Sequence, residues 1–188
     1  MPTPIGHSLM GGICYSAGNH RKFKWQTFLL FIFLANLPDF DYLPGAFLGT
    51  PNMFHRGISH SIGFAILLGG VVGFIWKLRS KRNYWRLLAI CTGVILSHVL
   101  LDYIGADTGY PYGVPLFWPL TNEYFIAPLV IFSDLYKGMT TSSFLSGTLD
   151  IHNFYTILRE VLILLPVWGA TFLGRKLLKA KKSQLVQA

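Results

Sequence analysis

The chain has 188 residues, of which 52% are hydrophobic and only 13% are charged, and its mean hydropathy is +0.46. An average soluble domain carries about 25% charged residues, so the composition indicates one membrane-embedded domain. The net charge of +8 would suit a nucleic-acid-binding protein, but 13 of the 16 basic residues lie in three clusters at the ends of apolar runs: 21–24, 77–86 and 175–182. That distribution is typical of the cytoplasmic side of membrane proteins and argues against a nucleic-acid partner.

Five apolar segments are predicted to be helices: 5–17, 25–37, 59–77, 84–104 and 155–173. The first two would reach only about 20 Å, against a hydrocarbon core of about 30 Å, so they cross only if extended or in a thinned bilayer. The last three are long enough to span, and we expect Ser59 to cap the third. Residues 40–57 and 105–122 are predicted to be loops, and the sequence does not decide whether the apolar run at 123–136 spans.

Helix order places all three basic clusters on one membrane face and the polar residues of the other helix ends on the opposite face. We therefore predict an all-α, polytopic integral membrane helical bundle with short N-terminal helices and a metal site near one membrane face. Residues 1–175 form the membrane-embedded domain and residues 176–188 a basic cytoplasmic tail. The expected location is the plasma membrane, with the basic loops and the C-terminus in the cytoplasm and the metal site toward the exterior.

Two carboxylates and two imidazoles fall within one short polar stretch between apolar segments, at Asp39, Asp41, His55 and His60. Carboxylate oxygens and imidazole nitrogens are the ligands of zinc and similar divalent ions. Charged groups next to membrane segments are costly, so a charge kept there is a functional candidate. One aspartate could bind the ion while the other orients a ligand histidine or acts as a base.

His98 and Asp102 are four residues apart on an apolar helix and therefore share one face. Alone, such a pair is more often a polar contact between helices than a metal site. The other ligand-type residues at the same end of the bundle, including His7, favour the metal site.

Other charged residues lie on the same side. The planar fork of Arg56 suits a phosphate or carboxylate, although the side chain could equally extend to the lipid headgroups. Arg159 and Glu160 are expected to form an interfacial ion pair. Asp107 and Glu123 remain open candidates.

Residues 3–125 resemble the YdjM-like, LexA-regulated, membrane-bound metal-dependent hydrolases. The resemblance is carried by five motifs: Thr3-Pro4-Ile5-Gly6-His7, Pro38-Asp39-Phe40-Asp41, His55-Arg56-Gly57-Ile58-Ser59-His60-Ser61, Ser97-His98-Val99-Leu100-Leu101-Asp102 and Phe117-Trp118-Pro119.

That family is distantly similar to the zinc-dependent phospholipases C and the single-strand-specific zinc nucleases. The similarity implies a ligand order of an early histidine, here His7, then Asp41 with His55, then His98 with Asp102. The chain has no later histidine followed by a His-x-x-x-Glu pair, so one or two ions are expected rather than three.

The predicted function is a membrane-bound metal-dependent phosphoesterase that hydrolyses a phospholipid or a lipid-linked phosphate with metal-activated water. The expected partners are the bilayer and that substrate, and the oligomeric state is left open. The alternatives are a metal-ion or proton transporter and a structural protein stabilised by the metal. The expected ion is Zn²⁺, or another divalent metal, with His7, Asp41, His55, His60, His98 and Asp102 as ligands and Asp39, Arg56 and His60 as catalytic residues.

Overall fold

The computed structural model describes residues 1–18, 23–109, 112–138, 140, 143, 147 and 149–187. Arg21 and Lys22 of the first basic cluster lie outside these residues. The described part contains no β-strand beyond two isolated bridges, which confirms the all-α prediction. Its helices are α1 (Pro4–Ala17), α2 (Trp25–Asn36), η1 (Leu37–Asp41), α3 (Tyr42–Phe47), η2 (Pro51–Met53), η3 (Ile58–His60), α4 (Ile62–Leu78), α5 (Tyr84–Tyr103) and α7 (Ile151–Gln187).

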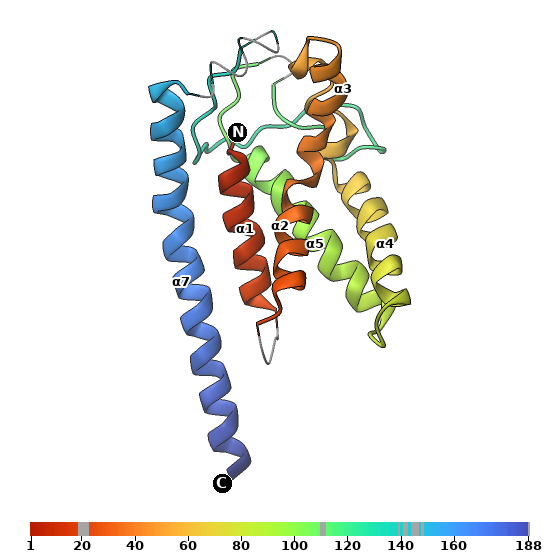
Figure 1. Ribbon diagram of the computed structural model, residues 1–188, viewed down its shortest axis with the longest axis vertical. Coiled ribbons are helices and arrows are strands. Elements are labelled where there is room, and N and C mark those ends of the chain that lie inside the picture. Colours follow the sequence, from red (N-terminus) through yellow and green to blue (C-terminus); the bar gives the residue numbers. More distant parts are fainter. Residues whose placement is uncertain are drawn as a thin grey trace.

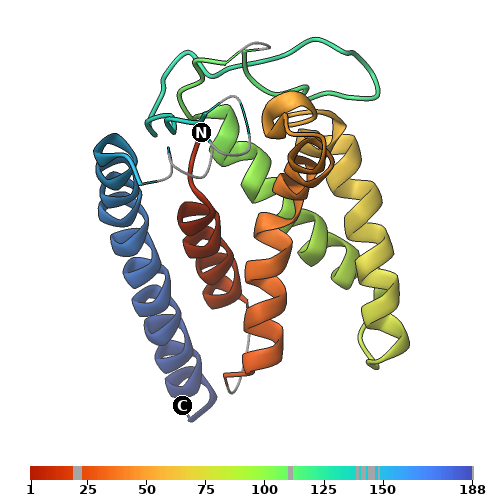
Figure 2. The ribbon, with the colours of Figure 1, turned by 45° about the horizontal axis from the view of Figure 1, so that its top comes forward.

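Two helical hairpins and one long helix make up the structure. The hairpins are α1–α2 and α4–α5, and α7 runs along α1 (Figure 1). The N-terminus, the short helix α3 and the irregular segment after α5 all lie at one end, while the C-terminus and the α4–α5 turn lie toward the other (Figures 1 and 2). Four helix ends that are distant in sequence therefore meet in one layer.

Helices α1, α2 and α5 match their predicted bounds to within one residue. The third predicted helix begins at Ile62 instead of residue 59, because Ser59 belongs to η3. Ser61 is the actual cap, since its Oγ accepts a hydrogen bond from the Phe64 N–H at 3.1 Å. With 17 residues, α4 falls short of a full span, whereas Tyr84–Tyr103 and Ile151–Ala180 are long and apolar enough to cross a membrane.

The predicted loop at 40–57 is irregular only at 48–50 and 54–57. The remainder belongs to η1, α3 and η2, each with a proline near its start, at Pro38, Pro44 and Pro51. Proline is tolerated in a first helical turn because the N–H that it lacks has no partner there. The last helix begins earlier than predicted and continues into the basic tail, and residues 123–136, whose spanning was left undecided, form no helix.

Glycines let the helices approach closely. A Cβ added to Gly69 of α4 would lie 2.6 Å from the backbone nitrogen of Thr92 in α5, and one added to Gly12 of α1 would lie 2.6 Å from the Trp168 ring of α7. Small residues at such contacts allow backbones to pack in membrane bundles. The Trp168 Nε1–H also donates to Ser16 Oγ at 2.7 Å, so α7 is attached to α1 by packing and by a hydrogen bond.

A buried apolar cluster lies directly beneath the layer of polar residues. It includes Leu34 and Ala35 of α2, Ala65 of α4, and Val94 and Ile95 of α5. This core packs α5 against α2 one helical turn before His98. The packing fixes the position of the two helices along each other, and therefore which of their polar side chains meet.

Candidate metal centre

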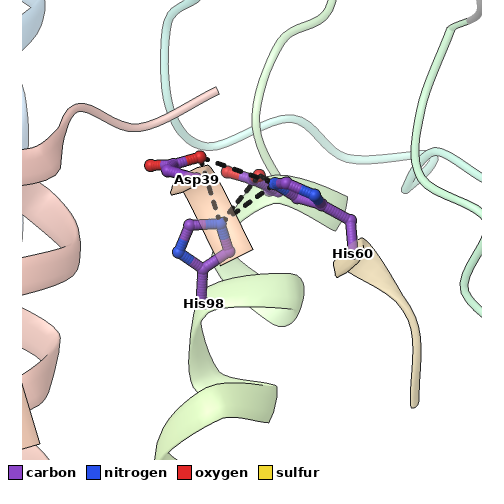
Figure 3. Close-up of side chains that lie close together, drawn as sticks. Asp39, His60 and His98 are labelled. Atoms are coloured by element: carbon purple, nitrogen blue, oxygen red, sulfur yellow. Dashed lines mark hydrogen bonds and ion pairs between the residues drawn. The ribbon is translucent and has the colours of Figure 1, made fainter. Parts of the chain in front are cut away.

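Each polar residue of the centre sits where a helix begins or ends. Asp39 lies in η1, directly after α2, and His60 lies in η3, directly before α4. His98 and Asp102 lie in the last turns of α5, and His7 lies in the first turns of α1. Figure 3 shows that Asp39, His60 and His98 point toward one another from three different elements.

Four side chains bring one nitrogen or oxygen each to a common point: Asp39, His60, His98 and Asp102. The His60 and His98 Nε2 atoms are 3.1 Å apart, and Asp102 Oδ2 lies 3.2 and 3.4 Å from them. Asp39 Oδ1 lies 3.5 Å from each Nε2. Ligand atoms bonded to one tetrahedral zinc at about 2.0–2.1 Å are separated by about 3.3 Å, so the four residues fit such an ion.

Several of these buried atoms have no hydrogen-bond partner in the described structure. They are Asp39 Oδ1, both carboxylate oxygens of Asp102 and both ring nitrogens of His7. Buried polar atoms are nearly always satisfied, because leaving them unpaired costs free energy. A cation bonded to the carboxylate oxygens and to one nitrogen of His7 would satisfy most of these atoms, which is a second reason why the donor set fits a divalent ion.

His7 extends the group on one side. Its ring stacks on that of His98 with centroids 3.7 Å apart, and its Nε2 lies 3.3 Å from the second oxygen of Asp102, Oδ1. Asp102 therefore faces His7 with one oxygen and His60 and His98 with the other. This geometry would let Asp102 serve one ion alone or two ions as a bridge.

Neighbouring groups orient the histidines. His98 Nδ1 lies 2.8 Å from the Ala35 carbonyl, which can only accept, so this nitrogen carries the proton and Nε2 is left as the ligand atom. His60 Nδ1 lies 3.0 Å from Ser59 Oγ and 3.2 Å from Asp41 Oδ2. Partners of this kind fix the ring orientation of metal-bound histidines.

A second group that could hold an ion consists of Asp41, His55 and His60. Its carboxylate is already satisfied: Asp41 Oδ1 lies 2.9 Å from His55 Nδ1, and Oδ2 accepts from the Ser59 hydroxyl at 2.6 Å and the Arg56 N–H at 3.1 Å. Burial alone would raise the pKa of Asp41, but the hydrogen bonds from His55 and His60 hold it well below its usual range. Burial lowers the pKa of His55 to about 3.

Arg56 lies at the edge of the centre in a strained conformation. Its φ of 62° is in the left-handed region, which non-glycine residues adopt mainly where the surroundings impose it. Its guanidinium forms an ion pair with Asp107. The predicted phosphate clamp is therefore already bound to a carboxylate, and the open candidate Asp107 has a partner. Glu123, the other open candidate, is exposed.

The predicted pair of Arg159 and Glu160 does not form. Arg159 donates to Ser133 Oγ at 3.0 Å, whereas Glu160 is fully buried and turns toward the N-terminus. It accepts from the Thr3 N–H at 2.7 Å and from the Thr3 hydroxyl at 2.5 Å. The sequence could not show this contact because it joins residues 157 positions apart.

Sequence reasoning also missed Lys137, which lies on the site side and lines a cavity of about 880 Å³ together with His55 and Arg56. The sequence did contain one indication of Lys137. Three basic residues fall outside the three clusters, namely Arg56, Lys137 and Arg159. All three lie on the side of the molecule opposite the α4–α5 turn, where isolated cations need a specific reason to be kept.

The fold and the site define a class of protein, an α-helical membrane protein with a buried cluster of imidazoles and carboxylates that could hold a divalent ion. The chain belongs to the YdjM inner membrane protein family, whose model matches residues 1–178, and this confirms the family expected from its motifs. It is 36% identical over 131 residues to the inner membrane protein YbcI of Escherichia coli (strain K12), covering 68% of this chain and 73% of YbcI. No solved structure matches it.

Proposed function

We propose that the chain is a polytopic membrane hydrolase that uses one or two divalent ions, zinc being best suited to the ligands, to cleave a phosphoester of a lipid. The observation that carries the proposal is the group of Asp39, His60, His98 and Asp102, with tetrahedral spacing and unsatisfied oxygens. The proposed distant relationship to zinc-dependent phospholipases C and zinc nucleases rests on a different set, the order of His7, Asp41 with His55, and His98 with Asp102 in the sequence. A bound ion would lower the pKa of a water molecule and polarise a phosphoryl oxygen.

The protein's own residues have separable roles in this proposal. His60, His98, Asp39 and Asp102 would hold the ion, and the side chain of Asp41 would keep His60 oriented through its Nδ1. Asp39 is the most exposed member of the four, with 12% of its side chain accessible against 1% for Asp102. Asp39 is therefore the group best placed to exchange a proton with a reacting water.

The depth of the site supports a lipid substrate. Helices α1 and α2 have 14 and 12 residues, or about 21 and 18 Å, so their site-side ends do not reach across a full hydrocarbon core. The adjoining short helices expose large apolar side chains, including Leu43 (51%), Phe47 (88%) and Leu48 (66%). Such side chains suit the boundary between headgroups and acyl chains, where a lipid phosphate also lies.

The test is metal analysis of purified full-length protein combined with a panel of phospholipids and lipid-linked phosphates. We expect about one to two zinc ions per chain, and hydrolysis that a chelator abolishes and added zinc restores. Asp102→Asn should lose both metal and activity, while Glu123→Gln, which removes an exposed carboxylate, should keep both. Metal-loaded protein that cleaves nothing in the panel but moves zinc or protons across liposomes would replace this proposal with a transporter.

A further inference from the structure

Three side-chain nitrogens converge on one point beside the candidate metal centre. His55 Nε2, Arg56 Nε and Lys137 Nζ lie 3.0, 3.3 and 2.8 Å from a single atom, the sulfur of Met1. A thioether sulfur is a weak hydrogen-bond acceptor. His55 donates to Asp41 Oδ1 through Nδ1, so its Nε2 carries a lone pair. The donors at this point are Arg56 Nε and Lys137 Nζ, whose capacity to donate exceeds what the sulfur can accept.

Among these groups, Lys137 is the one whose positive charge lacks a carboxylate partner. Its ammonium donates to the Tyr42 hydroxyl and lies 5.1 Å from the centroid of the Tyr42 ring, but no carboxylate of the described chain is within ion-pair distance. Arg56, in contrast, is paired with Asp107. A buried charge is costly unless it is paired. Burial, with a further contribution from Arg56, lowers the pKa of Lys137 to about 8.

The surroundings leave room for a ligand. The three residues line the cavity of about 880 Å³, which also includes Met1. Methionine has a flexible, unbranched side chain that can turn away from an incoming group. The His55 ring centroid is 5.0 Å from that of His60, so a ligand at the convergence point would be one ring away from the candidate metal ligands.

Of the two carboxylates that line the cavity, one is paired with a cation. Asp107 is paired with Arg56, and Asp134 accepts a hydrogen bond from Thr108 Oγ1 at 2.5 Å. Lys137 therefore remains the cation without a carboxylate partner in this part of the described chain.

We propose that the convergence point binds the phosphate group of the substrate, with Lys137 as its principal cation and Arg56 as an additional donor. The proposal rests on the proposed phosphoesterase function and adds a positioning residue to it. Lys137 would hold a non-reacting oxygen of the phosphate and so determine substrate affinity.

The test uses inorganic phosphate as the probe and titrates it calorimetrically into the full-length protein in detergent, with and without zinc. Lys137→Gln should weaken phosphate binding about tenfold or more in both forms, because it removes a charge-assisted hydrogen bond. Lys137→Arg should stay within about threefold of wild type. Zinc content should not change, and Lys81→Gln, in the exposed α4–α5 turn, should bind phosphate as wild type does.

Kinetic measurements with a lipid phosphoester as substrate separate this inference from the proposed function. If hydrolysis occurs, Lys137→Gln should raise KM more than it lowers kcat. Wild-type phosphate affinity in Lys137→Gln overturns the anion site and leaves the phosphoesterase proposal intact. Lysine-dependent phosphate binding without any hydrolysis supports the site and counts against the phosphoesterase. If Lys137→Gln also loses zinc, Lys137→Met, which keeps the length of the side chain, is measured in its place and decides by the same criteria.

Discussion

The two aspartates of η1 are only two positions apart, yet their carboxylates have different surroundings. Asp39 Oδ1 faces the Nε2 atoms of His60 and His98 and has no hydrogen-bond partner, whereas Asp41 accepts from a backbone N–H, a hydroxyl and an imidazole. We therefore expect Asp39 to bind the ion and Asp41 to orient the histidines around it.

Substitution of each aspartate by asparagine tests this division. Asp39→Asn should lose most of its zinc on desalting, because a ligand loses its charge. Asp41→Asn should keep a site whose zinc affinity is lowered about 10- to 100-fold, as is typical when a partner of a ligand histidine is changed. Competition with a chromogenic chelator measures both. Loss of zinc from Asp41→Asn alone would assign the ion to the group of Asp41, His55 and His60.

The members of the site were more predictable than their individual contacts. The four-residue spacing identified His98 and Asp102 as neighbours, and helix order placed His7, His55 and His60 at the same end. The sequence prediction made Asp41 a ligand and Asp39 a catalytic residue, whereas the contacts favour Asp39 as the ligand and Asp41 as the group that orients the histidines. Both lie in one short turn, so residue spacing could not separate their roles. Lys137 was missed because it follows an irregular segment whose course no periodicity describes.

At the scale of elements, the contact between α4 and α5 depends on close backbone approach at Gly69. Gly69→Ala would place a methyl group 2.6 Å from the Thr92 backbone nitrogen, and we expect a loss of about 1–3 kcal/mol, as for other overpacked sites. Gly93→Ala is the matched control, since nothing lies within 4 Å of its Cβ. Thermal unfolding in detergent should show a lower Tm for Gly69→Ala only, and equal values would show that the helices separate without cost.

The contact between α7 and α1 depends on Glu160. Glu160→Ala leaves the Thr3 N–H and hydroxyl without their buried acceptor, at a cost of about 1–3 kcal/mol. Because Thr3 caps α1, whose first turns carry His7, zinc affinity should fall together with Tm. Arg159→Ala removes the neighbouring, exposed hydrogen bond and should change neither. A drop in Tm with unchanged zinc affinity would mean that His7 does not contribute to the site.

The helices themselves were largely predictable, because long apolar runs bounded by polar residues fix α1, α2 and α5. The bounds that differed have local causes. Ser59 lies in a 3₁₀ turn, so α4 starts later, and prolines begin short helices within the expected loop at 40–57. Sequence periodicity does not reveal elements of three to six residues, since they complete less than two turns.

For the whole molecule, we propose that the end with the α4–α5 turn faces the cytoplasm, following the distribution of basic residues. Single cysteines at Thr50 and Lys81, both exposed, test this in a background with Cys14→Ser and Cys91→Ala. An impermeant thiol reagent added to spheroplasts should label Thr50→Cys and spare Lys81→Cys until the membrane is permeabilised. The opposite pattern would invert the protein in the membrane.

The attachment of α1 to α7 also has a consequence for biosynthesis. Thr3 and Glu160 are 157 positions apart, so α1 is translated well before the helix that anchors its start. A nascent chain that has inserted only through α5 already contains every ligand of the four-residue group, but α1 still lacks its contacts with α7. His7 therefore reaches its final place beside Asp102 only when α7 enters the membrane, and its contribution to metal binding should be a late step of biogenesis.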